Sequence, residues 1–231
     1  MKSRKFDMAA LRTAFADNKS DNKSATDNKW LRFYDMEFDE SMTLRIVQDV
    51  DVEGTNVTGM VRKSSTHRFK IGDTFKTFTC NRHNHNEDCA LCDASAALYK
   101  EKRNDEGRKI YKSDKFFMQC LVVESPTGET DGMLKFVSFT KNIFEQIKDG
   151  LTELDEAPFD IENGTDLKIK KTKNGEWAKY TVSFVRKERA LTETEIATIE
   201  ADAVDLATLL PAAADATEVE QAASDYLESI S

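Results

Sequence analysis

The sequence predicts a mixed α+β fold, mainly β, in which a small β-barrel carries an inserted metal-binding subdomain. Short segments rich in β-branched and aromatic residues recur along the chain, separated by turn signals and a few helical segments. A series of short strands of this kind is typical of a small barrel. All three histidines and three of the four cysteines fall within residues 66–92, which indicates the insert.

The length and the charge distribution predict three parts. A chain of 231 residues suits one domain of about 150–170 residues with appendages. We expect a basic arm and linker over 1–29 and a core over 30–190 that contains the metal subdomain at about 62–115. An acidic helical tail is expected over 191–231.

The net charge of −9 arises in the tail. Residues 191–231 contain ten acidic side chains and no basic one, so the first 190 residues hold all 33 basic side chains against 32 acidic ones. Within them, 62–115 holds thirteen basic against eight acidic residues, and 166–189 holds eight against three. This asymmetry predicts a basic surface for a polyanionic ligand and a detachable acidic tail that competes with that ligand.

The N-terminal segment is expected to be a tethered arm. Residues 1–16 suit a short basic amphipathic helix, and 17–29, where Asp-Asn-Lys occurs three times, suits a flexible linker. The basic start is not followed by the apolar run of a signal peptide, and no stretch approaches the roughly 18 apolar residues of a membrane helix. We therefore expect a soluble, intracellular protein without membrane contact, whose clustered cysteines are metal ligands rather than disulfides.

Periodicity predicts the elements from residue 30 onward. Strands are expected at 30–34, 42–47, 57–69, 75–80, 116–123, 134–139, 167–171 and 177–185. Asn174-Gly175 is a strong hairpin signal between the last two strands. Helices are expected at 93–103, at 143–151, from the capping box of Thr192 and Glu195 to Leu210, and at 216–230.

The cysteines indicate a metal site. Cys89 and Cys92 form a C-x-x-C pair, and Cys80 stands nine positions before it. One tight turn directs two thiolates at a single ion, and structural zinc sites hold four cysteines, or three cysteines with one histidine. The sequence therefore predicts one structural zinc ion. Cys120, within an apolar strand, is expected to be a buried thiol.

The fourth ligand can come from His67, His83 or His85. Proximity in the chain favours the last two. If residues 66–80 form a hairpin with a four-residue loop, however, His67 stands opposite Cys80 on the same face. We therefore predict one ligand set, with His83 and His85 as alternatives to the histidine: His67, Cys80, Cys89 and Cys92.

A catalytic role for this cluster is disfavoured by its spacing. His85-Asn86-Glu87 matches the H-x-E motif of zinc deaminases, in which the cysteine pair comes from a separate element. Here only one residue separates Glu87 from Cys89, so Glu87 has no room to face a metal-bound water. No P-loop, G-x-G-x-x-G or G-x-S-x-G motif is present, and we predict no catalytic residue and no enzymatic activity.

Aromatic and basic residues are interleaved in two regions after the cluster. Sequence-independent binding of a nucleic-acid strand requires cations for the phosphates and aromatic faces for the bases. Any of these aromatic residues could instead belong to the core, as we expect for Phe117. Arg45, on an earlier strand, could reach a phosphate or simply line the strand. The predicted contacts are Arg45, Tyr99, Arg108, Lys109, Tyr111, Lys112, Phe116, Lys171, Lys173, Trp177, Lys179 and Tyr180.

The pattern His67-x12-Cys80-x8-Cys89-x2-Cys92, in a basic β-rich domain with a basic arm and an acidic tail, resembles one known family. It is similar to the single-stranded DNA-binding (helix-destabilising) proteins of T-even-type bacteriophages. The similarity extends over about 30–187. It includes Trp30, Leu44-Arg45-Ile46, Phe116-Phe117, Lys141-Asn142-Ile143 and Trp177-Ala178-Lys179-Tyr180.

The resemblance implies an OB-fold that holds the strand in a basic cleft, with the zinc subdomain as one wall. It implies a protein that coats and protects single-stranded DNA during phage replication, recombination and repair, in the cytoplasm of the infected host cell. Residues 1–16 would contact neighbouring copies along the DNA, and the tail 191–231 would contact replication and recombination proteins. A zinc-stapled protein-interaction adaptor and a single-stranded RNA binder are the alternative functions.

Overall fold

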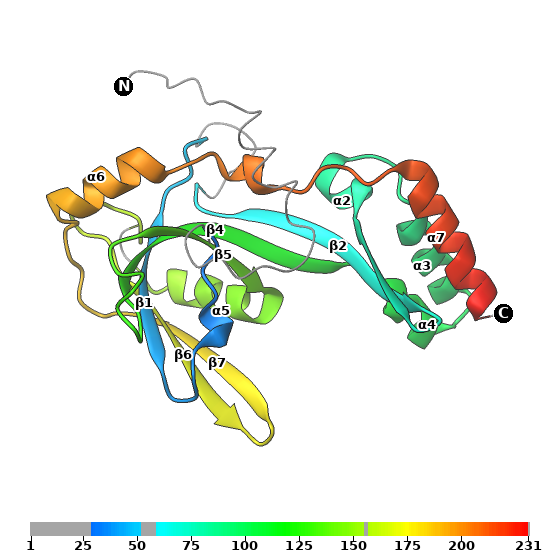
Figure 1. Cartoon of the computed structure of the whole chain (residues 1–231), viewed down its shortest axis with the longest axis horizontal. Coiled ribbons are helices and arrows are strands. Elements are labelled where there is room, and N and C mark those ends of the chain that lie inside the picture. The colour runs from blue at the N-terminus through cyan, green and yellow to red at the C-terminus, as the bar shows by residue number, and fades with distance from the viewer. Residues whose placement is uncertain (1–28, 52–58, 155–156, 231) are drawn as a thin grey trace.

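One antiparallel sheet of seven strands organises the computed structural model, which describes residues 29–51, 59–154 and 157–230 (Figure 1). The strands are β1 (Ser41–Val47), β2 (Arg62–Ile71), β3 (Thr74–Thr79), β4 (Ser113–Glu124), β5 (Leu134–Thr140), β6 (Leu167–Asn174) and β7 (Trp177–Phe184). Their order is β3-β2-β4-β1-β6-β7, and β5 pairs with β4. The predicted α+β class is confirmed, whereas the predicted arm at 1–16 and most of the linker lie outside the described residues.

β4 is the longest strand and joins two lobes. Its first half pairs with β2, its second half pairs with β1, and β5 pairs with its middle. The β2–β3 hairpin therefore extends from one end of β4, and the strands β1, β6 and β7 lie at the other end. We call the lobe that contains β1, β5, β6 and β7 the first lobe. Figure 1 shows the resulting two lobes, with β2 and β4 running from one into the other.

Helices cover both lobes. Three gather on the β2–β3 hairpin, and we call this hairpin with its three helices the metal module: α2 (Asn81–His85), α3 (Ala90–Lys100) and α4 (Asn104–Ile110). α5 (Lys141–Leu151) packs against β5 and β7 in the first lobe and buries Ile143 and Ile147, one turn apart. α6 (Glu193–Asp202), the 3-10 helix η2 (Leu206–Leu209) and α7 (Ala216–Ser229) follow β7.

The two larger hydrophobic cores lie on one face of the sheet, which we call the inner face. Met118 and Cys120 of β4 are buried in the first lobe, and His67 and Phe69 of β2 are buried in the metal module. The pairing of Lys63 with Phe116 places the even positions of β4 and the odd positions of β2 on this same face. Cys120 is the buried thiol predicted from the sequence, and burial raises its pKa to about 12.

The segment after α6 is fastened to the opposite, outer face of β4. The side-chain amide of Gln119 donates to the carbonyl of Val204 and accepts from its amide, both at 3.1 Å. The backbone amide of Leu206 donates to Asp49 Oδ1 at 2.8 Å. Leu206 and Leu209 are buried against Phe136, so η2 covers part of this face.

α7 completes the core of the metal module. Its residues Val219, Ala222, Ala223 and Tyr226 are buried with Phe69. The hydroxyl of Tyr226 also donates to the carbonyl of Glu106 in α4 at 2.9 Å. The expectation of a detachable acidic tail is therefore wrong for this segment, because its apolar side is part of a core.

Two predicted elements differ most from the structure, while others are shifted by a few residues: the strand predicted at 57–69 is Arg62–Ile71, and the helix predicted at 93–103 is Ala90–Lys100. Residues 30–34 do not form a strand: Trp30 makes one isolated bridge to Phe136, and Phe33–Asp35 form the 3-10 helix η1. The helix that begins at the capping box of Thr192 and Glu195 ends at Asp202 rather than Leu210, because the chain then extends to reach Gln119.

The start of α6 is stabilised by an ion pair as well as by its capping box. The guanidinium of Arg189 binds both carboxylate oxygens of Glu195, at 2.8 and 2.9 Å. This contact, together with the hydrogen bonds from Thr192, lowers the pKa of Glu195 to about 2 despite partial burial.

None of the helices in the described ranges combines the length and the hydrophobicity that crossing a membrane requires.

Candidate metal centre and nucleic-acid interface

Four side chains of the metal module meet with the geometry of a metal site. The ligand atoms of His67, Cys80, Cys89 and Cys92 all lie within 4.8 Å of one another. Nε2 of His67 is 3.5 Å from Sγ of Cys89 and from Sγ of Cys92, and Sγ of Cys80 is 3.5 Å from Sγ of Cys92. A tetrahedron with metal–ligand bonds of about 2.0–2.3 Å has edges of roughly 3.4–3.8 Å. The four side chains therefore fit a closed, four-coordinate site.

The ligands come from the hairpin and from the helix packed against it. β2 carries His67, and Cys80 follows the end of β3. Cys89 is the N-cap of α3, and Cys92 lies in the first turn of the same helix. The N-terminus of a helix has a positive potential, which stabilises thiolates. A bound ion would join the hairpin to α3.

Hydrogen bonds orient His67 for this role. Its Nδ1 lies 2.8 Å from the carbonyl oxygen of Ile110, so the Nδ1–H donates there and Nε2 faces the cysteines. Burial acts to lower the pKa of His67, but hydrogen bonds with Cys80 and Cys89 outweigh it and raise the pKa to about 9. Hydrogen bonds with Cys80 and Cys92 lower the pKa of Cys89. Metal binding must therefore displace a proton from His67.

The other two histidines lie away from the cluster. His83 is exposed on α2, and Nε2 of His85 lies 3.1 Å from the carbonyl oxygen of Pro211. The predicted order of preference among the three histidines thus agrees with the geometry, although the predicted hairpin loop does not. Ile71 pairs with Thr74, which leaves a two-residue turn in place of the expected four-residue loop.

Because the turn has two residues rather than four, the observed pairing of β2 with β3 differs from the predicted pairing by two residues. His67 pairs with Phe78 rather than with Cys80. Because side chains alternate with a period of two, an even shift leaves His67 and Cys80 on the same face. The ligand prediction therefore survives an incorrect loop length.

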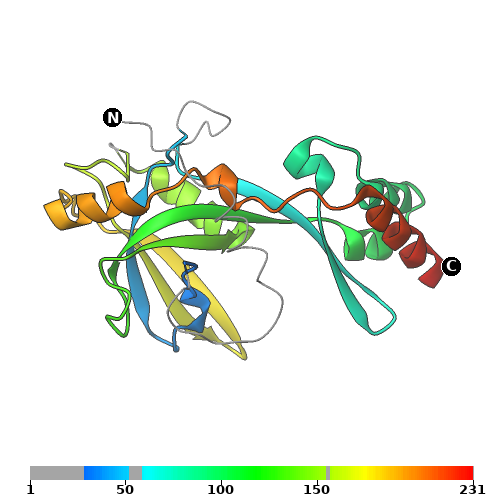
Figure 2. The ribbon, with the colours of Figure 1, turned by 45° about the horizontal axis from the view of Figure 1, so that its top comes forward.

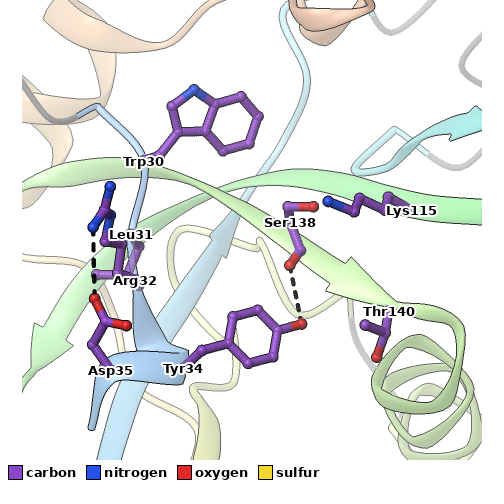
Figure 3. Close-up of a pocket in the computed structure, with 8 residues that line it drawn as sticks. All are labelled: Trp30, Leu31, Arg32, Tyr34, Asp35, Lys115, Ser138 and Thr140. Atoms are coloured by element: carbon purple, nitrogen blue, oxygen red, sulfur yellow. Dashed lines mark hydrogen bonds and ion pairs between the residues drawn. The ribbon is translucent and has the colours of Figure 1, made fainter. Parts of the chain in front are cut away.

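A pocket of about 480 Å³ lies at the edge of the first lobe beside β5 (Figure 3). Its walls combine two aromatic rings, two cations and two hydroxyls with an apolar and an acidic side chain. They are Trp30, Tyr34, Arg32, Lys115, Ser138, Thr140, Leu31 and Asp35. We call it the edge pocket. Figure 3 shows the amine of Lys115 directed toward Ser138. Rings for bases and cations for phosphates are the groups with which proteins bind single strands.

The rings of the edge pocket are held in place from behind. Trp30 packs edge-on against Phe117, with ring centroids 5.3 Å apart. Tyr34 packs edge-on against Tyr180 at 5.2 Å, and its hydroxyl donates to the carbonyl of Ser138 at 3.4 Å. Phe117, expected in the core, is half-buried beneath Trp30. These contacts fix the orientation of both rings.

Seven of the predicted contact residues are exposed. They are Tyr99, Arg108, Lys109 and Tyr111 in the metal module, and Lys173, Trp177 and Lys179 on the β6–β7 hairpin. Trp177 is 79% exposed, and the rings of Tyr99 and Tyr111 pack edge-on at 6.3 Å. The structure leaves these side chains accessible but does not bring the two groups into one pocket.

Four predicted residues are engaged inside the protein. Lys112 Nζ pairs with Asp114 at 2.6 Å, and Lys171 Nζ donates to the carbonyl of Tyr34 at 2.8 Å. Tyr180 points toward the inner face, opposite to Trp177 and Lys179, and its hydroxyl donates to the carbonyl of Tyr34 at 3.3 Å. Phe116 stacks on Phe144 of α5 at 4.0 Å. The side chains of these four residues contact other parts of the protein and are less available to a ligand than the seven exposed ones.

The prediction of a nucleic-acid contact at Arg45 is wrong. Its side chain is fully buried, and Nε pairs with Asp166 Oδ1 at 2.7 Å. Its other nitrogens donate to the carbonyls of Asp160 and Arg189 at 3.2 and 3.1 Å. A guanidinium with these partners cannot reach a phosphate, and Asp166 also binds Arg189 Nε at 2.7 Å.

Sequence reasoning missed most of the edge pocket. Trp30 is part of the family resemblance only, and Tyr34, Arg32 and Lys115 are not among the contacts that the sequence predicts. The available signal was the segment Trp30-Leu31-Arg32-Phe33-Tyr34, which interleaves aromatic residues with a cation. Its pairing with Phe136, about a hundred residues later in the chain, has no local signature.

The comparison with known protein families is consistent with a nucleic-acid-binding surface. Residues 39–227 match a family model described as gp32 DNA binding protein like. No curated protein matches the chain.

Proposed function

Since the family match over 39–227 shows that this chain belongs to the gp32-like DNA-binding proteins, we propose that it coats and protects single-stranded DNA, largely independently of sequence. Phage DNA replication, recombination and repair, in the infected host cell, are the processes that we propose for it. The proposed preference for single strands depends on the edge pocket. Its aromatic rings are accessible at an edge of the sheet, which suits unpaired bases better than a duplex.

The strand arrangement supports the proposal of an OB-fold in the first lobe. β1, β4, β5, β6 and β7 form a five-stranded antiparallel sheet. α5 packs against β5 and β7, the two outer strands of this group. A five-stranded, partly open barrel of this kind is the architecture that OB-folds use to bind oligonucleotides.

We propose Zn²⁺ as the ion of the metal centre. Three thiols with one imidazole are a donor set of structural zinc sites, and a closed tetrahedron leaves no position for a substrate. Bound there, zinc would stabilise the fold of the metal module. His67, Cys80, Cys89 and Cys92 would hold it, and the carbonyl of Ile110 would orient His67.

We propose two kinds of protein partner. Neighbouring copies along the DNA would be contacted through the basic residues 1–16, and replication and recombination proteins through 191–231. Within the latter segment the acidic side chains of α7, and those of α6 other than Glu195, are exposed, while the apolar side of α7 is buried. Partners would therefore meet an acidic helical surface rather than a free tail.

Titrating the protein with oligo(dT) while following tryptophan fluorescence tests the proposed function. We expect quenching, because Trp30 lines the edge pocket and Trp177 is exposed. We also expect affinity to fall with salt concentration, because phosphate binding releases counterions. Absence of salt-sensitive quenching, or equal binding to single-stranded RNA, would contradict the proposal.

Replacing Lys115 with glutamine tests the pocket itself. Losing one phosphate contact should weaken binding across sequences and lower the slope of log K against log salt by about 0.7. Lys148→Gln is the matched control, because Lys148 is an exposed lysine of α5 whose nearby charge is Glu145. Equal effects of the two substitutions would show that only net charge matters.

A further inference from the structure

The β2–β3 hairpin has one covered face and one bare face. His67 and Phe69 point to the inner face, where the metal centre and α7 cover them. Alternation places Arg68 and Lys70 of β2 on the outer face, together with their partners Thr77 and Phe75 of β3. All four of these residues are exposed. In Figure 2 the tip of the hairpin projects beyond the helices of the metal module.

The exposed face of the hairpin and the edge pocket lie on the same side of the sheet. Lys115, which lines the pocket, pairs with Ser64 of β2 on one side and with Thr140 of β5 on the other. Paired residues share a face, and Ser64 shares its face with Arg68 and Lys70. The distance from Ser64 to Lys70 along β2 is about 20 Å at 3.3 Å per residue. The pocket and the exposed part of the hairpin therefore share the outer side of the sheet, with the buried Ser64 beneath the path between them and exposed cations at both ends, Lys115 and Arg68.

The chemistry of this face suits a single nucleic-acid strand. The ring of Phe75 is 60% exposed, and the guanidinium carbon of Arg68 lies 4.9 Å from its centroid. Residues 62–79 contain five basic side chains and one acidic one, Asp73, which pairs with Lys70 at the turn. A single exposed phenylalanine is unremarkable by itself. An exposed ring flanked by cations, in line with an aromatic pocket, is a stacking platform.

We propose that Phe75 is a second base-stacking site, and that Arg68 and Lys70 bind the adjacent phosphates of a strand that passes from the edge pocket onto the hairpin. This inference rests on the proposed binding of single-stranded DNA and extends it to the metal module. The hydroxyl of Thr77, beside Arg68, would be a further phosphate donor.

Substitutions at Phe75 test the stacking. Phe75→Leu keeps an apolar side chain but removes the ring, and we expect its dissociation constant for (dT)20 to rise roughly 5- to 150-fold, as for loss of one base–aromatic contact. Phe75→Trp should bind at least as tightly as the wild type. Ile161→Ala is the matched control, because Ile161 is another exposed apolar residue, 53% exposed, and should leave the affinity unchanged.

Arg68 and Lys76 provide a matched pair for the phosphate contacts. Both are exposed cations of the same hairpin, but Lys76 pairs with Phe69 and so belongs to the inner face. Arg68→Gln should lower the salt slope by about 0.7, whereas Lys76→Gln should leave it unchanged. Metal content and the unfolding midpoint of each variant show that the hairpin is intact.

The outcomes separate this inference from the proposed function. If the wild type does not bind (dT)20, the proposed function fails. If the wild type binds and Phe75→Leu binds equally tightly, the proposed binding of DNA at the edge pocket is unaffected, but the proposed stacking site on the hairpin is overturned. Equal salt slopes for Arg68→Gln and Lys76→Gln would likewise overturn the phosphate contacts.

Discussion

Replacing Cys89 with serine is expected to abolish metal binding and to unfold the metal module together with α7. Structural zinc binds zinc-finger peptides with about 10–16 kcal/mol of apparent free energy, comparable to the roughly 5–15 kcal/mol that stabilises a whole domain. Cys89 and Leu91 share a core with Val219 and Tyr226 of α7, so loss of the ion should release both parts. Metal analysis should fall from one ion per chain to none, and amide hydrogen exchange should rise in α3 and α7.

The fourth cysteine provides the control for this experiment. Cys120 is buried in β4, outside the metal cluster, and Cys120→Ala should retain the ion. His83→Ala and His85→Ala should retain it as well, whereas His67→Ala should lose it. Full metal content in Cys89→Ser, or a loss in His83→Ala, would contradict the assigned ligand set. A chelator added to the wild type should reproduce the exchange pattern of Cys89→Ser.

Replacing Arg45 with methionine is expected to destabilise the fold by about 3 kcal/mol, the lower end of the range for breaking a buried ion pair. The lower end applies because Asp166 would keep Arg189 as a partner. For a domain of this size the midpoint of thermal unfolding should fall by roughly 6–12 °C. Urea or thermal unfolding measures the loss. Affinity for oligo(dT) at a temperature where the variant is folded should not change.

An exposed ion pair is the matched control for Arg45. Lys148 pairs with Glu145 at 3.3 Å on the surface of α5, and Lys148→Met should cost less than about 1 kcal/mol. If Arg45→Met instead unfolded at the wild-type midpoint and lost affinity for oligo(dT), Arg45 would be a DNA contact after all.

Local patterns in the sequence predicted the local features of the fold. The strand at 42–47, the helix at 143–151 and the capping box of Thr192 and Glu195 each depend on residues within one or two turns, and the structure contains them. The metal cluster was predictable for the same reason. Its four ligands lie within 26 residues, and hairpin alternation alone brought His67 to the cysteines.

Features that depend on distant partners were not predictable. Arginine side chains are mostly exposed, so the sequence suggests an exposed Arg45. Its carboxylate partner Asp166 stands 121 residues later in the chain. The many acidic residues of 191–231 suggest an exposed tail, although the apolar side of α7 is buried. Its small residues Ala222 and Ala223 contribute little to the hydrophobic periodicity that would predict a buried helix face. The edge pocket required the pairing of Trp30 with Phe136.

The docking of α7 has a consequence for how the protein is made. Phe69 in β2 and Tyr226 in α7 pack edge-on at 5.6 Å, although more than 150 residues separate them. Such a contact closes a long loop and therefore forms late. During synthesis at about 5–20 residues per second, the ribosome needs some ten to thirty seconds to make the intervening chain. Throughout that interval the metal module lacks one side of its core, and an early-bound ion would hold it together until α7 is made.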